Sequence, residues 1–168
     1  MKTTTAALIS LSLLTAACSP AASPQTPAKE SNAAMTATTR PAIITLTSPH
    51  SFEQTTARVA AAIEKRPLNL FAKIDHAAGA AKADLTLAPS TLFIFGNPKG
   101  GTPLMTRNAQ MGIVLPLKMH VYQDGGDVKI SYTDIAAESK LHGLDSEQLP
   151  VPNIVKMLSG LAAEVTTP

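Results

Sequence analysis

The stretch IVLPLKMHVYQDGGDVKISY, residues 113–132, decides the fold. Its first half alternates apolar with other residues, a period of two that is typical of a strand with one buried face. The segment Asp124-Gly125-Gly126-Asp127 then predicts a tight turn into a second strand over 128–132. Two strands joined by so short a turn must be antiparallel. The first strand is expected from Ile113 to Tyr122, and its Pro116 implies an edge or a bulge because proline has no amide hydrogen.

Three more strands are predicted before this hairpin. Short apolar runs bounded by turn residues indicate strands over 43–47, 70–75 and 91–95. The run 70–75 alternates, so we expect a half-buried strand. The run 91–95 is apolar on both sides, and both of its faces therefore need cover.

Two long amphipathic helices accompany these strands. Ser51 and Gln54 form a capping-box pair at the start of the first helix, and Pro67 ends it. The last helix is expected from Asn153 and carries a single apolar stripe. That stripe consists of Ile154, Met157, Leu158, Leu161, Ala162 and Val165.

Shorter helical insertions are expected at three places. Asp75 can cap one or two turns over 77–83, since alanine has the best helix propensity. Thr102 is expected to cap a short helix with Pro103 at its first position. Asp134 can cap a third helix that ends near His142.

The order of these elements predicts the fold class. Strand, helix, four strands and helix indicate an α+β domain: an antiparallel sheet of about five strands with both long helices on one face. The opposite face must then be solvated, paired with a second copy of the chain, or covered by a loop. The loop from Gly96 to Met111 follows the fully apolar strand and is expected to be that lid.

The N-terminal segment predicts export and lipidation. Lys2 precedes an apolar run, Ala6 to Leu14, that is too short to span a bilayer but suits a signal peptide. Small residues lead directly to Cys18, and the segment resembles a bacterial lipobox. The resemblance implies cleavage after residue 17 and acyl chains on Cys18, which would bind the membrane lipid. The alternative is an ordinary secretory signal with an incidental cysteine.

This anchor predicts a location and a domain organisation. Ser19 stands where aspartate would signal retention in the inner membrane, so a periplasm-facing protein on the outer membrane is expected. Residues 18–40 are rich in Ala, Ser, Thr and Pro without periodicity, and predict a disordered tether. A single α+β domain is expected over 41–168.

Composition excludes several classes of function. From residue 41 onward eleven Lys and Arg face eleven Asp and Glu, so the clustered positive charge of a nucleic-acid-binding protein is missing. Aromatic residues make up 4% of the chain, which leaves no stacking platform for bases. A single cysteine excludes an internal disulfide and a thiolate zinc cluster.

Four motifs carry a family resemblance. They are IDH at 74–76, FGNPKGGTPLM at 95–105, LPLK at 115–118 and SY at 131–132. In this order they resemble the domain of unknown function 302 family, over about residues 43–144. Val114 stands where that family often has aspartate, and Lys82-Ala83-Asp84 stands where a Gly-Leu pair is usual. The resemblance implies a curved sheet and two helices similar to the TATA-binding-protein fold, and it implies no established activity.

These motifs also supply the candidate site. We expect a pocket beneath the loop, between it and the sheet, that binds a small ligand or an envelope protein. The candidate residues are Asp75, His76, Phe95, Gly96, Asn97, Lys99, Thr102, Met105 and Lys118. Asn97 and Lys118 are expected to contact the ligand without being needed for folding.

Two other functions remain open. An enzyme could use Asp75, His76 and Lys118, but catalysis is disfavoured because the chain carries no nucleophile motif or cofactor fingerprint. No cofactor is therefore expected. A copper-handling protein could use Met105, Met111, Met119 and His120 as soft ligands, although core packing is the more frequent role of such methionines.

Overall fold

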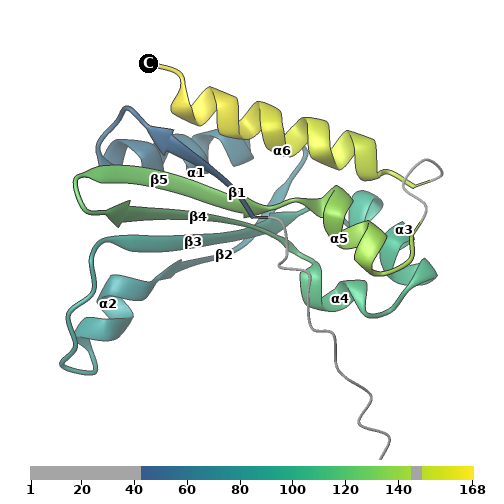
Figure 1. Cartoon of the computed structure of the whole chain (residues 1–168), viewed down its shortest axis with the longest axis horizontal. Coiled ribbons are helices and arrows are strands. Elements are labelled where there is room, and N and C mark those ends of the chain that lie inside the picture. The colour runs from purple at the N-terminus through teal and green to yellow at the C-terminus, as the bar shows by residue number, and fades with distance from the viewer. Residues whose placement is uncertain (1–42, 145–148) are drawn as a thin grey trace, which may run out of the picture. The chain divides into compact units, whose positions relative to one another are not determined.

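The computed structural model describes residues 43–144 and 149–168 (Figure 1). The expected signal peptide over 1–17, the lipidated Cys18 and the tether up to residue 40 lie outside these residues. All elements described below belong to the domain expected from residue 41 onward.

Five strands form one antiparallel sheet, as the sequence predicts. They are β1 (Ile43–Ser48), β2 (Asn69–Asp75), β3 (Ser90–Gly96), β4 (Leu117–Asp124) and β5 (Asp127–Thr133). Their order across the sheet is β1-β5-β4-β3-β2. The β4–β5 hairpin turns at Gly125, whose φ of 60° is a conformation that glycine adopts without strain.

The two long helices cover one face of the sheet (Figure 1). Helix α1 (Phe52–Glu64) begins with the predicted capping box, in which Ser51 and Gln54 each accept from the other's backbone amide. Helix α6 (Val151–Thr166) packs against α1 and β1, and it starts two residues earlier than expected. Strand residues that face these helices, such as Phe93 and Met119, are fully buried.

The short helices lie at the ends of the sheet. Helix α2 (His76–Ala81) is capped by Asp75, which accepts from the amide of Ala78 at 2.8 Å, as predicted. Helix α5 (Ile135–Leu141) is capped by Asp134. Helices α3 (Pro98–Arg107) and α4 (Met111–Val114) fill the connection between β3 and β4.

The prediction of a long strand from Ile113 is wrong. Residues 111–114 form α4 and the strand begins at Leu117, directly after the cis Leu115-Pro116 bond. Proline has no amide hydrogen for the ladder, so pairing starts after Pro116. Strand β4 is also central rather than an edge, because β3 and β5 pair with it on either side.

The predicted start of the helix after β3 is also wrong. Asn97, not Thr102, is the N-cap: its side-chain oxygen accepts from the amide of Lys99 at 2.9 Å. Pro98 then occupies the first turn, where a missing amide hydrogen has no cost. Thr102 and Pro103 therefore lie inside α3.

Strand β2 is more exposed than predicted. Of its seven residues only Ala72 is partly covered, and Phe71 is 54% exposed. β2 is an edge strand that pairs with β3 alone, with an irregular register at Phe71. Alternation in the sequence predicts the strand but does not show that one of its sides lacks a neighbour.

Candidate functional site

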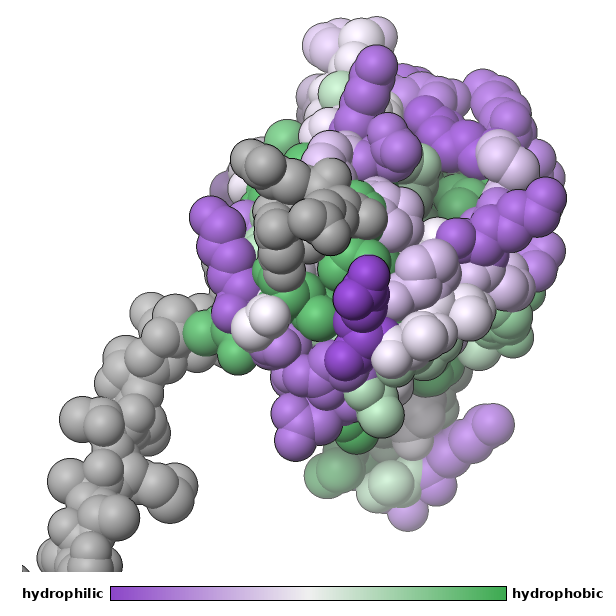
Figure 2. All heavy atoms as spheres, turned by 90° about the vertical axis from the view of Figure 1, so that its right-hand side faces the viewer, coloured by the Kyte–Doolittle hydropathy of each residue, from purple (hydrophilic) through white to green (hydrophobic). Residues whose placement is uncertain are grey.

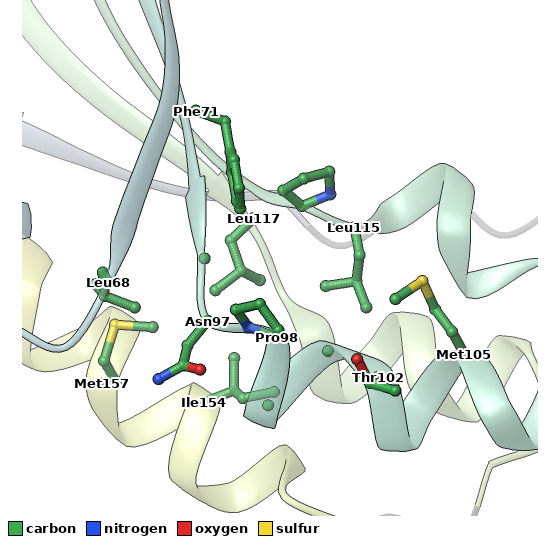
Figure 3. A pocket seen from close by; sticks show the side chains of 14 residues that line it. Leu68, Phe71, Asn97, Pro98, Thr102, Met105, Leu115, Leu117, Ile154 and Met157 are labelled. Atoms are coloured by element: carbon green, nitrogen blue, oxygen red, sulfur yellow. The ribbon is translucent and has the colours of Figure 1, made fainter.

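A cavity of about 210 Å³ lies where β3 runs into α3. Its walls come from the ends of β2 and β3, from α3, from the segment before β4 and from α6 (Figure 3). The lining residues are Leu68, Phe71, Gly96, Asn97, Pro98, Gly100, Gly101, Thr102, Met105, Leu115, Pro116, Leu117, Ile154 and Met157. Asn97 and Thr102 alone among them carry a polar side chain, so the cavity is apolar.

Asn97 holds two walls of this cavity together. Its side-chain nitrogen donates to the carbonyl of Pro67 at 2.8 Å, while its side-chain oxygen caps α3. One amide therefore ties the connection between α1 and β2 to the start of α3, thirty residues later. Both polar atoms are used, so Asn97 acts first as a structural residue.

Glycines let α3 approach its neighbours. A Cβ on Gly101 would lie 3.4 Å from Leu115, and one on Gly100 would lie 3.7 Å from Ile154. Both glycines line the cavity. Any larger side chain at either position would have to enter it or push its neighbours away.

The candidate residues of the FGNPKGGTPLM motif lie at or beside this cavity. Gly96, Asn97, Thr102 and Met105 line it. Lys99 is exposed and Phe95 is fully buried in the core, so neither belongs to the lining.

The other three candidates lie elsewhere. Asp75 is engaged in capping α2, and His76 begins that helix near His120. Lys118 donates to the carbonyls of Val114 and Pro116 at 2.9 and 3.0 Å, which ties the α4–β4 connection to the strand. Burial lowers the pKa of Lys118.

The expected lid does not cover the open face of the sheet. Residues 98–107 form α3, whose Leu104 is fully buried in the core and whose Gly100 lies beside Ile154 of α6. This segment thus lies at the end of the sheet. Its apolar side chains do not cover the open face, because Leu104 and Met111 are buried in the core and Met105 lines the cavity.

Ten cavity residues were not among the candidates. Six of them belong to the FGNPKGGTPLM and LPLK motifs: Pro98, Gly100, Gly101, Leu115, Pro116 and Leu117. The other four, Leu68, Phe71, Ile154 and Met157, come from the connection before β2, from β2 and from α6. Because these segments are far apart in the sequence, no local pattern indicates that they meet. Only the apolar stripe of α6 could have placed Ile154 and Met157 toward the interior.

Apolar side chains also reach the surface near this end of the molecule. Met105 on α3 is 38% exposed and Ile113 on α4 is 86% exposed. Figure 2 looks at the end where α3, α4 and α5 lie and shows hydrophobic side chains there among hydrophilic ones. Met105 also lines the cavity, so the apolar surface of the cavity continues to the exterior there.

The second notable surface is the face of the sheet that α1 and α6 leave free. It carries a row of polar and aromatic side chains from β1 to α2. Thr45 and Ser131 share a hydrogen bond of 2.8 Å, and Ser131 donates to Tyr122 at 3.3 Å. Tyr122 in turn stacks on His120, with ring centres 4.8 Å apart.

The soft copper ligands do not come together. Met111 and Met119 are fully buried in the core, and His120, next to Met119 in β4, points to the opposite face. Within residues 43–144 and 149–168, no three His, Cys, Asp or Glu side chains gather closely enough to hold a metal ion.

The fold and the cavity define a class: a small α+β domain with one helix-covered face and one open face. Residues 44–165 match the family described as domain of unknown function DUF302. The chain belongs to this family, and the resemblance found in the sequence is confirmed.

One solved structure has the same fold. The crystal structure of an uncharacterized conserved protein DUF302 from Bacillus stearothermophilus aligns with a TM-score of 0.65. The alignment covers 73% of this chain and 97% of that one at 18% sequence identity. At that identity the likeness shows the fold alone.

Two curated relatives are proteins of Brucella. Both are named fluoride-specific ion channel FluC 1, from Brucella suis biovar 1 and Brucella abortus biovar 1, and both are 40% identical over 103 residues. The match takes 61% of this chain and 41% and 38% of theirs, so the chain spans about 40% of their length. In the described part of this chain, no helix is both long and apolar enough to cross a membrane.

Proposed function

We propose that this chain is a lipid-anchored protein of the bacterial envelope whose domain binds a small apolar molecule in the cavity between β3, α3 and α6. The observation that carries the proposal is the cavity itself, about 210 Å³ with almost wholly apolar walls. A ligand gains affinity there by removing apolar surface from water.

The size of the cavity limits the ligand. An apolar cavity of about 150 Å³ is known to stay dry and to bind benzene or xenon. A cavity of about 210 Å³ therefore suits a single aromatic ring or a short branched alkyl group. The hydroxyl of Thr102, at the exposed surface of α3, can orient one polar group of such a ligand.

The anchor is supported by the sequence. The short apolar run of residues 6–14, the small residues after it and Cys18 favour cleavage and lipidation, and Ser19 favours the outer membrane. Two or more acyl chains would hold the protein stably at the bilayer, with its domain facing the periplasm.

An envelope protein or a second copy of the chain are the alternative occupants. Either could insert a side chain into the cavity and cover Phe71 and Met105 at the surface. Conduction of fluoride is named for whole Brucella proteins, of which this chain spans about 40%, so our proposal rests on the cavity instead.

Benzene is the probe that tests the cavity. We expect it to raise the melting temperature of the protein and to shift NMR signals of Leu117, Ile154 and Met157. Gly100→Leu places a branched side chain against Ile154 and should abolish both effects. Gly160→Leu is the matched control on α6, where an added Cβ meets nothing within 4 Å, and it should leave benzene binding unchanged.

Other results would contradict ligand binding. Equal benzene effects in Gly100→Leu and the wild type would place the ligand elsewhere. A dimer in light scattering, lost on Phe71→Ser while benzene has no effect, would make a second copy the occupant.

Cys18→Ser tests the anchor. We expect the wild-type protein to partition into detergent and the variant to accumulate as an uncleaved or soluble product. If the variant were processed normally and stayed on the membrane, the lipobox interpretation would be wrong.

A further inference from the structure

Two of the four histidines meet on the open face of the sheet. His76 begins α2 and His120 lies in the middle of β4, forty-four positions later, so the fold alone brings them together. Their ring centres are 5.9 Å apart and their planes are nearly perpendicular, at 89°. No function described above uses this pair.

The ring of His120 is held in place by its neighbours. One ring nitrogen shares a hydrogen bond of 2.8 Å with the hydroxyl of Ser90 on β3. The ring also stacks on Tyr122, nearly parallel to it at 16°. Metal-binding histidines are commonly oriented by such a hydrogen bond from the second nitrogen.

The surroundings of His120 also affect its protonation. Burial, and then the charge of His76 beside it, lower the pKa of His120. These surroundings favour the neutral imidazole, which is the form that binds a metal ion.

We propose that His76 and His120 together bind one divalent transition-metal ion on the open face of the sheet. Imidazole nitrogens bind such ions at about 2.0–2.1 Å, and a distance of 5.9 Å between ring centres is within the reach of two rings that share one ion. His76 is exposed, so water completes the coordination and exchanges freely. This site is distinct from the apolar cavity and does not depend on a ligand there.

The donor set selects the ion. Imidazole suits copper, nickel and zinc, whereas magnesium and calcium take oxygen ligands. Among divalent ions of the first row, copper binds most tightly to a given set of nitrogen ligands. Cu²⁺ is therefore the ion expected to bind first, with Zn²⁺ and Ni²⁺ weaker.

Cu²⁺ titration of the full chain tests the site. Every sample carries Cys18→Ser, so that the single thiol cannot compete. We expect one equivalent of Cu²⁺ whose electron paramagnetic resonance spectrum shows two nitrogen ligands. His76→Ala removes one of the two ligands and should leave one nitrogen ligand in the spectrum. Loss of an outer-shell partner alone weakens metal binding about 10- to 100-fold, and His76→Ala should weaken Cu²⁺ binding at least as much.

The remaining histidines supply matched controls. His50 contacts the carbonyl of Thr167 and His142 ends α5, both away from the pair. His50→Ala and His142→Ala should leave the affinity and the spectrum unchanged. His76 is exposed, so its variant keeps the fold even if His120→Ala does not. Unchanged affinity in His76→Ala, or an equal loss in either control, would overturn the proposal.

Discussion

The two faces of the sheet are built from the same strands and have opposite properties. Toward α1 and α6, Phe93, Met119 and Val121 are fully buried. On the other face, Ile94, His120 and Tyr122 alternate with them and are only partly covered. Helices exclude water from the first face, while polar side chains join one another across the second. The first face supplies stability, and the second is free to carry chemistry.

The largest effect should come from the covered face. Phe93→Ala leaves a cavity in a fully buried position and should reduce the free energy of unfolding by about 3–5 kcal/mol. Ile94→Ala, one position along on the open face, should cost well under half as much because its side chain already contacts water. Urea unfolding measures both. Equal losses would mean that the open face is covered too, as in a dimer.

An intermediate loss of stability is expected at the end of the sheet, where the cavity lies. Asn97→Ala removes the cap of α3 and the bond to Pro67, and should cost about 1–2 kcal/mol. Thr102→Ala should have almost no effect on unfolding, since Thr102 lies inside α3 and is exposed. Thermal melts separate the two variants. The reverse ranking would restore Thr102 as the helix cap.

The smallest effect should come from the open face. It is a dependence of the free energy of unfolding on pH. The pKa of His120 is lower in the folded protein than its usual 6.5, so the unfolded chain binds a proton first as pH falls. Stability should therefore be full above about pH 6.5 and decrease below it, toward the lowered pKa. Urea unfolding in the presence of a chelator at several pH values measures this. His120→Gln should flatten the decrease, and His142→Gln should not.

Sequence patterns predict the elements of this fold well where the cause is local. The Ser51 capping box, the Asp75 and Asp134 caps and the β4–β5 turn depend on residues a few positions apart, and all are confirmed. Errors arise where a pattern has two interpretations. Residues 113–115 alternate like a strand, yet α4 ends there and Pro116 delays the ladder.

The site was harder to predict because it depends on distant contacts. Four of the predicted residues that line the cavity, Gly96, Asn97, Thr102 and Met105, belong to the single motif FGNPKGGTPLM. Other lining residues, such as Leu68 and Ile154, lie far from this motif in the sequence. Likewise, Asp75, His76 and Lys118 were grouped with that motif, although none of them lines the cavity. Asp75 caps α2, His76 lies near His120, and Lys118 ties the α4–β4 connection to the strand. The sequence does not show which strands are neighbours, so it cannot assign residues of different strands to one surface.

Strand order also has a consequence for how the domain assembles in time. Along β2, β3, β4 and β5 each strand pairs with the next in the chain, whereas β1 pairs with β5, so that Ile43 meets Thr133 across 90 positions. Closing so long a loop costs more entropy than forming the neighbouring pairs. The first strand of the sequence is therefore expected to be the last to join the sheet. Until it does, the edge of β5 stays unpaired and open to another strand, which is when the folding chain is most exposed to aggregation.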